Sequence, residues 1–258
     1  MGFKRIIARA ISEGWAAGRN LLGPRPGFRI LLYHSVGTRL THDTYGISIE
    51  PSLFKRHMQL LSESPGITIG SLFDTRVAGS DLRVAVTFDD GYKDNLYTAA
   101  PILLKFQIPF TVFVTTSFMQ NESRDYLTER ELRDLASLPG VNIGSHGTTH
   151  SPLAHCDELA LWLELHESRC RIEDVIGRQV KTIAYPHGSV NQRVRYAAER
   201  AGYDVGVCSR FGINDENRDP LLLCRSEVLA SDSERVFRQK ISGAWDWYRW
   251  RSRDPLFL

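Results

Sequence analysis

The chain has 258 residues, 42% hydrophobic and 24% charged, a composition typical of a globular protein with a well-buried core. Its 32 basic and 30 acidic residues give a formal net charge of +2 without a lysine or arginine block, which excludes nucleic acid as a partner. The four cysteines lack the paired spacing of a structural zinc site, so we expect buried free thiols at Cys156, Cys170, Cys208 and Cys224.

The first 25 residues predict a basic amphipathic segment, in which apolar residues recur near helical spacing among arginines and a lysine. This segment and the aromatic and basic stretch at residues 245–251 can lie in a membrane interface or simply cover a core, and both alternatives remain open. It lacks the apolar core of a secretory signal, and no stretch reaches the roughly 20 apolar residues that span a bilayer. We expect a cytoplasmic location, with peripheral binding at the inner membrane face as the alternative.

From about Phe28 onward, short β-rich runs alternate with longer helical patterns, which is typical of parallel βαβ units. The predicted strands are residues 29–34, 84–88, 109–115, 141–145, 181–185, 204–208 and 220–224. The predicted helices are residues 51–64, 94–106, 128–138, 156–177, 190–201 and 232–250. The longest helix is amphipathic and is expected to pack on the outside of the sheet through the apolar residues that alternate with its charged ones, Leu159, Leu163, Cys170, Val175 and Ile176. The pattern predicts an α/β fold, a distorted (β/α) barrel of about seven parallel strands.

Polar residues gather at the predicted carboxyl ends of the strands, where the loops of a parallel barrel converge over one mouth. They are His34, Asp89, Asp90, Thr115, Thr116, His146, His150, Tyr185, His187 and Arg225. The remaining histidines fall on predicted loops or helices, and we expect His42, His57, His155 and His166 at the surface.

Two adjacent carboxylates, Asp89 and Asp90, close the second predicted strand and are followed at once by Gly91. Successive side chains of a strand point to opposite faces, so both carboxylates can share one site only if the chain turns there. Gly91 permits such a turn. For an isolated Asp-Asp-Gly step, a solvated acidic turn is the alternative.

His146 and His150 are spaced four residues apart just after a predicted strand, so that one helical turn would bring both imidazoles to the same side. With a strand-end carboxylate they supply two nitrogens and one oxygen, the open three-ligand set of catalytic zinc. Taken alone, the pair could be two unrelated surface histidines.

These two motifs resemble those of the NodB-homology polysaccharide deacetylases, carbohydrate esterase family 4. Residues 87–91 (Thr-Phe-Asp-Asp-Gly) are similar to the first motif of the family and residues 145–150 (Ser-His-Gly-Thr-Thr-His) to the second. Residues 184–188 (Ala-Tyr-Pro-His-Gly) match the third motif in part. Residues 33–36 (Tyr-His-Ser-Val) resemble the branch whose members begin with a Tyr-His motif. The resemblance covers roughly residues 28–228.

The resemblance implies that Asp89 is the catalytic base and that one divalent metal ion is held by Asp90, His146 and His150. Zinc is the expected metal, with cobalt and nickel as alternatives. His187 occupies the place of the third-motif tyrosine, whose backbone N–H helps to bind the oxyanion in the family.

This sequence departs from the family pattern at two places. Ala184 stands where many members have the arginine that pairs with the base, and residues 221–225 lack the late histidine that acts as general acid. We expect His34 to supply the acid because it closes the first strand, with a core histidine as the alternative. We expect Arg225 to hold Asp89 ionised, with a surface ion pair to Glu227 or Asp219 as the alternative.

The expected function is that of a hydrolase acting on carbon-nitrogen (non-peptide) bonds. It would remove acetate from an N-acylated amino sugar in a polysaccharide or a lipid-linked glycan, so that its partner is an N-acetylated glycan or glycolipid. The alternatives are an amidohydrolase for a small non-sugar amide and a catalytically silent carbohydrate-binding relative. We place the catalytic domain at residues 26–230, after the N-terminal segment (1–25) and before a C-terminal helix with an aromatic and basic tail (231–258).

Overall fold

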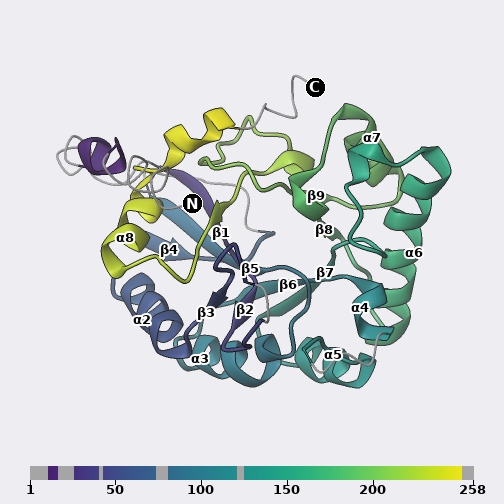
Figure 1. Cartoon of the computed structure of the whole chain (residues 1–258), viewed down its shortest axis with the longest axis horizontal. Coiled ribbons are helices and arrows are strands. Elements are labelled where there is room, and N and C mark those ends of the chain that lie inside the picture. Colours follow the sequence, from purple (N-terminus) through teal and green to yellow (C-terminus); the bar gives the residue numbers. More distant parts are fainter. Residues whose placement is uncertain (1–10, 17–25, 41–42, 74–80, 121–124, 252–258) are drawn as a thin grey trace.

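The computed structural model of the chain describes residues 11–16, 26–40, 43–73, 81–120 and 125–251, which form a ring of parallel strands with helices around the outside (Figure 1). Most of the predicted N-terminal segment and the last seven residues of the tail lie outside the described residues. Among the described residues, no helix combines the length and apolarity needed to cross a bilayer.

The main sheet is parallel at every pairing and has the order β10-β1-β5-β6-β7-β8-β9. Its strands are β1 (Gly27–Tyr33), β5 (Leu82–Phe88), β6 (Phe110–Val114), β7 (Val141–Ser145), β8 (Thr182–Ala184), β9 (Val205–Val207) and β10 (Ser226–Glu227). β4 (Ile67–Ile69) pairs with the first half of β5. A parallel bridge between Val207 and Leu223 joins β9 to the segment that leads into β10, and so completes the ring. The predicted barrel is confirmed.

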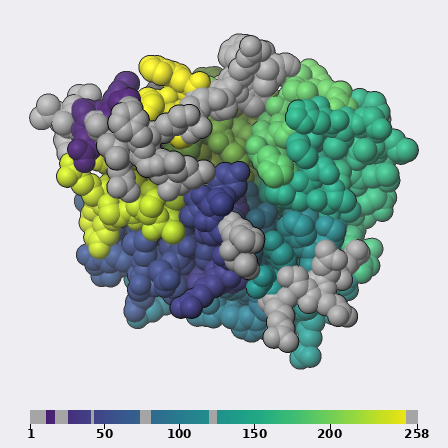
Figure 2. Space-filling model, viewed as in Figure 1, coloured from purple at the N-terminus to yellow at the C-terminus, as the bar shows by residue number. Residues whose placement is uncertain are grey.

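A second, two-stranded parallel sheet follows the carboxyl end of β1 and consists of β2 (Ser35–Val36) and β3 (Ser48–Ile49). In the space-filling view, the dark blue atoms of this part of the chain lie near the middle of the face that looks at the reader (Figure 2). They stand next to the teal atoms of later elements.

Side chains point alternately to the two faces of the sheet, and this creates two separate cores. The smaller one fills the ring and consists of Phe28, Ile30, Leu72, Ala85, Phe113, Ala184, Val205, Val207 and Leu223. The larger one lies between the strands and the surrounding helices and includes Leu31, Tyr33, Val84, Val86 and Phe88. Because side chains alternate along a strand, residues an even number of positions beyond Ile30, Ala85 and Leu223 face the interior. That rule places His34, Asp89 and Arg225 at the mouth of the ring.

The helices form the outer layer (Figure 1). They are α2 (Pro51–Ser62), α3 (Ala100–Lys105), α4 (Thr116–Gln120), α5 (Glu129–Ala136), α6 (Glu158–Ile176), α7 (Gln192–Arg200) and α8 (Glu234–Ser242), with a π-helical turn at Asn95–Ala99 before α3. Local capping fixes several ends. Thr128 and Glu131 form a capping box at the start of α5, and Gly177, at a φ of 69°, ends α6.

The seventh predicted strand, residues 220–224, is wrong. Pro220–Leu222 form a 3₁₀ turn, in which the Asp219 side chain accepts a hydrogen bond from the backbone N–H of Leu221. Proline has no N–H to give to a strand ladder, and the carboxylate beside it favours the turn. The strand that pairs with β1 begins at Ser226, four residues after the end of this turn at Leu222.

The long C-terminal helix predicted at residues 232–250 is also wrong in its extent. Gly243, at a φ of 83°, ends α8, and a separate 3₁₀ stretch follows at Asp246–Arg251. Glycine adopts this left-handed conformation without steric cost, so the helix ends there. The Asp246 carboxylate then forms a bidentate pair with Arg29 of β1, which holds the 3₁₀ stretch against the ring.

The predicted inner face of α6 is only partly right. The side chains that it buries are Leu161, Glu164, Leu165, Ser168, Ile172 and Val175, whereas Leu159 and Leu163 are 69% and 44% exposed. The buried set continues at helical spacing along the whole helix, while the exposed leucines belong to an apolar patch near its start. The longer stripe faces the sheet.

His57 is buried, contrary to the expectation of a surface position. Its ring stacks on Phe237 of α8, with centroids 4.1 Å apart, and its Nδ1 lies 3.4 Å from the hydroxyl of Tyr33. Because α8 packs over α2, a position that looks external on α2 alone becomes internal. His155 is exposed and His166 is partly exposed, while His42 lies outside the described residues.

Candidate active site

The Asp-Asp-Gly step turns the chain at the end of β5. Asp90 has a φ of 72° and Gly91 a φ of 76°, so the regular alternation of the strand stops after Asp89. A Cβ on Gly91 would lie 3.2 Å from Cγ1 of Val114, so a side chain at this position would be crowded as well as strained. The turn brings both carboxylates to the same mouth, where Asp89 and Asp90 are 2% and 8% exposed. A solvated acidic turn is thereby excluded.

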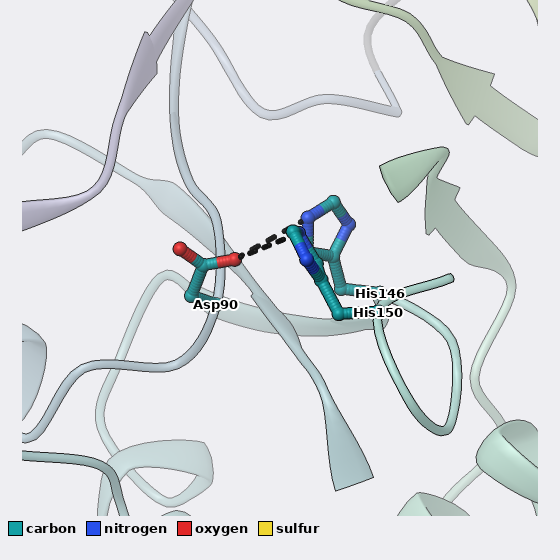
Figure 3. Close-up of side chains that lie close together, drawn as sticks. All are labelled: Asp90, His146 and His150. Carbon is teal, nitrogen blue, oxygen red and sulfur yellow. Dashed lines mark ion pairs between the residues drawn. The ribbon is translucent and has the colours of Figure 1, made fainter. Parts of the chain in front are cut away.

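His146 and His150 meet the carboxylate of Asp90 (Figure 3). The Oδ1 atom of Asp90 lies 3.5 Å from Nε2 of His146 and 3.4 Å from Nε2 of His150. The two imidazoles are neighbours, with ring centroids 4.9 Å apart, but the expected helical turn is absent. A loop joins them, in which His150 itself has a φ of 64°.

This group fits a divalent cation by three observations. One potential ligand atom from each of Asp90, His146 and His150 lies within 4.8 Å of the others. The separations of 3.4 and 3.5 Å match the distance of about 3.3 Å between ligands of a tetrahedral zinc ion. Asp90 Oδ1 is also buried with no hydrogen-bond partner among the described residues, although buried carboxylate oxygens are normally paired.

The protonation of both histidines suits the same role. Nδ1 of His146 lies 2.7 Å from the carbonyl oxygen of Ala184, so this nitrogen carries the proton and Nε2 is left as a free lone pair. Burial, and next the neighbouring His146, lower the pKa of His150 to about 4. His150 is therefore a neutral imidazole at neutral pH, the form that coordinates metals.

Asp89 is paired with Arg225 in the interior of the ring. The two terminal nitrogens of the guanidinium donate to the two carboxylate oxygens, each over 2.7 Å, and the Arg225 side chain is fully buried. Burial by itself raises the pKa of Asp89, but the charge of Arg225 and its hydrogen bonds to the carboxylate outweigh this effect. The pKa of Asp89 lies well below its ordinary range. The alternative partners Glu227 and Asp219 are not used, since Asp219 pairs with Arg195.

His34 lies beside Asp89 at the carboxyl end of β1. The backbone N–H of Asp89 donates to the carbonyl oxygen of Tyr33, and the charge of His34 contributes to the low pKa of Asp89. The Nδ1 atom of His34 is buried without a hydrogen-bond partner among the residues that the structure describes. The structure therefore brings His34 to the mouth of the ring without a fixed partner for its ring.

His187 stands at the rim of the site. Its side chain is exposed, and its ring packs edge-on against that of His150, with centroids 4.4 Å apart. Its backbone has a φ of 57°, and the next residue is Gly188 with a φ of 65°. His187 is not part of the Asp90, His146 and His150 group.

Two polar residues of the site region were missed in the sequence. Asn95 donates from its side chain to the carbonyl oxygen of His34, and Asp94 accepts from the hydroxyls of Ser35 and Thr38. Both residues fix the chain that follows β1, and both are buried. In the sequence, Asp94 and Asn95 follow Asp90 by four and five residues, and this closeness to the Asp-Asp-Gly step could have indicated that they belong to the site region.

Comparison with known proteins supports the resemblance to polysaccharide deacetylases. Residues 76–206 match the family model described as polysaccharide deacetylase. YxkH of Bacillus subtilis, whose name assigns it to the polysaccharide deacetylases, is 28% identical over 213 residues, which cover 81% of this chain and 74% of that protein. The poly-beta-1,6-N-acetyl-D-glucosamine N-deacetylase of Staphylococcus aureus is 27% identical over 136 residues, 48% of this chain and 46% of that protein.

Solved structures share the fold. The deacetylase PplD of Streptococcus pyogenes, in complex with acetate, has a TM-score of 0.73 at 24% identity over 84% of this chain and 99% of that chain. IcaB from Ammonifex degensii has a TM-score of 0.71 at 18% identity over 86% of this chain and 98% of that chain.

Proposed function

The chain belongs to the polysaccharide deacetylase family, and from that premise we propose that it hydrolyses the N-acetyl groups of an amino sugar in a glycan with the help of a divalent cation. The observation that carries the proposal is the arrangement of Asp90, His146 and His150 beside the buried pair of Asp89 and Arg225. A metal-binding group and an ionised carboxylate at one mouth are the two parts that amide hydrolysis by water requires.

Asp90, His146 and His150 would hold the cation, with zinc as the proposed metal. When bound, such an ion polarises an amide carbonyl and lowers the pKa of water. Asp89 then serves as general base and accepts a proton from the attacking water. Arg225 keeps the Asp89 carboxylate ionised and oriented. A carboxylate with a low pKa is a weak base. Asp89 is therefore suited to accept a proton from water whose pKa the cation has already lowered.

The remaining groups act on the amide itself. His34, which follows β1 beside Asp89 and whose Nδ1 has no hydrogen-bond partner among the described residues, is proposed to donate a proton to the departing amine. The backbone N–H of His187 is proposed to stabilise the oxyanion. The products are acetate and a free amino group on the sugar, so atoms and protons balance with one water consumed.

The substrate is proposed from the relatives. The Staphylococcus aureus relative is named for action on poly-beta-1,6-N-acetyl-D-glucosamine. A polymer of N-acetylglucosamine is therefore the first choice for this chain, and a lipid-linked N-acetylated glycan is the second.

The test couples metal analysis to acetate release. Chelator-treated protein is reloaded with Zn²⁺, Co²⁺ or Ni²⁺ and assayed with β-1,6- and β-1,4-linked N-acetylglucosamine oligomers, a lipid-linked glycan and small N-acetyl amides. We expect one metal ion per chain and acetate from a glycan, with both lost in Asp90→Ala. Stoichiometric metal with turnover of small amides alone would replace the glycan by a simpler amide, and a chain that binds no metal would contradict the proposal.

A further inference from the structure

A carboxylate from α6 holds the loop that joins His146 to His150. The side chain of Glu164 is 6% exposed and accepts hydrogen bonds from the backbone N–H groups of Thr148, at 2.8 Å, and Thr149, at 3.0 Å. It also accepts from the hydroxyl of Thr149. A buried charge needs such partners, and here they all come from the three residues between the two histidines.

The loop is shaped to receive this carboxylate. Gly147 has a φ of 77°, and a Cβ at this position would lie 2.8 Å from Oε2 of Glu164. A side chain there would therefore push the carboxylate away. The absence of one allows Glu164 to reach the backbone of the loop directly.

Glu164 is itself fixed to β7, the strand that ends just before His146. The hydroxyl of Ser168, one turn further along α6, donates to the carbonyl oxygen of Glu164 and lies 2.7 Å from the hydroxyl of Ser145 in β7. The loop is thus held between its own strand and α6. This matters because His150 adopts a φ of 64°, a conformation that costs a residue with a side chain on the order of 1 kcal/mol.

We propose that Glu164 is a positioning residue that sets the affinity of the site for its divalent cation, an inference that rests on the proposed function. Glu164 reaches the cation site through the backbone next to His150. A carboxylate is required rather than an amide, since all of its partners are donors and the NH₂ group of a glutamine would oppose one of them. Residues that orient metal ligands in this indirect way typically change metal affinity by about 10- to 100-fold when they are replaced.

The experiment measures metal binding without catalysis. Metal-free parent and Glu164→Gln proteins are titrated with Zn²⁺ against a chromophoric chelator, and the visible absorption spectrum of the Co²⁺ form is recorded. We expect a 10- to 100-fold weaker Zn²⁺ affinity in the variant and an altered Co²⁺ spectrum. Circular dichroism and thermal unfolding of the metal-free proteins show whether the variant is folded at the temperature of the titration.

Glu173→Gln is the matched control. Glu173 lies on the same helix and accepts from the backbone N–H of Val180, away from the loop, so its variant should bind Zn²⁺ like the parent. If Glu164→Gln does not fold, Thr149→Val removes the hydroxyl donor from an exposed position and should weaken binding in the same direction.

A folded Glu164→Gln protein with the affinity and Co²⁺ spectrum of the parent would overturn the inference and leave the proposed function standing. If only Thr149→Val folds, a Zn²⁺ affinity equal to that of the parent in this variant would likewise overturn the inference. A parent chain that binds no Zn²⁺ would overturn both the inference and the proposed function.

Discussion

Asp89 and Arg225 form a charge pair that the ring encloses completely, and the ionisation of Asp89 depends on the guanidinium of Arg225. When a neutral side chain replaces Arg225, burial becomes the dominant influence and raises the pKa of Asp89. We predict that Arg225→Gln lowers kcat/KM for deacetylation on the order of 10²-fold at neutral pH. Asp89 must be ionised to accept a proton. On acidification, the variant should therefore lose its activity at a higher pH than the parent does. The measurement is kcat/KM against pH.

The same substitution should destabilise the fold by about 3–5 kcal/mol, because it leaves a buried carboxylate without its partner. Arg193→Gln provides the control, since Arg193 pairs with the exposed Glu158. An acid limb of the pH profile that does not move in Arg225→Gln would mean that Asp89 is not the base.

His34 carries a second prediction at this scale. If it protonates the leaving amine, His34→Gln should reduce kcat on the order of 10²- to 10⁴-fold while the bound metal stays at one ion per chain. His166→Gln, at a partly exposed position on α6, should leave kcat unchanged. Parent-like kcat in His34→Gln would remove this residue from the proposed mechanism.

The residues of the site differ in how visible they are in the sequence. Asp90, His146 and His150 stand in short motifs at strand ends, so local spacing is enough to group them. The pairing of Arg225 with Asp89 joins residues 136 positions apart, and the surface-pair alternative could be excluded only by the closed ring. Glu164 was hidden because a charged residue on a helix normally faces solvent.

At the scale of elements, the packing of α8 over α2 creates a pH-sensitive contact. Burial, partly offset by the nearby Asp232, lowers the pKa of His57 from 6.5 to about 4. Between about pH 4 and pH 6.5, His57 is therefore protonated in the unfolded chain but neutral in the folded protein. We predict that the free energy of unfolding falls by about 3 kcal/mol on this account as the pH drops from about 6.5 to about 4, and does not fall further below that range.

Urea unfolding of the parent and of His57→Gln at pH 7 and pH 4.5 measures this contribution. The variant should be less stable than the parent at pH 7 but should lose less stability on acidification. His155→Gln, at an exposed position, should behave like the parent. Equal losses in the parent and in His57→Gln would exclude the buried imidazole as the cause.

Most elements could be predicted because alternation and helical spacing are local properties. Six of the seven predicted strands correspond to β1 and β5–β9. The errors arose where a local rule met a special residue or a tertiary contact. Pro220 stands at the head of an apolar run that otherwise favours a strand, Gly243 ends the predicted C-terminal helix early, and His57 becomes internal only when α8 covers it.

At the scale of the whole molecule, the cation would connect the turn after β5 to the loop after β7, two strands separated by β6. Because a ligand that binds only the folded state stabilises it, Zn²⁺ at 100 times its Kd should add about 2.7 kcal/mol. We predict that chelation lowers the Tm by roughly 5–10 °C and that Zn²⁺ restores it. Calorimetry of parent and Asp90→Ala measures this, and Asp90→Ala should show no response to Zn²⁺. A chelator-insensitive parent Tm would contradict this linkage.

The bridge from Val207 to Leu223 and the pairing of β1 with β10 close the ring only near the end of the chain. During synthesis, Asp89 therefore leaves the ribosome long before Arg225 does. Until the ring closes, any compact intermediate must keep Asp89 hydrated or protonated, because a lone buried carboxylate is costly. Closure is a contact between distant parts of the chain and is intrinsically slow. We therefore predict that the pair of Asp89 and Arg225 forms late in folding, and that a chain ending before Arg225 is inactive.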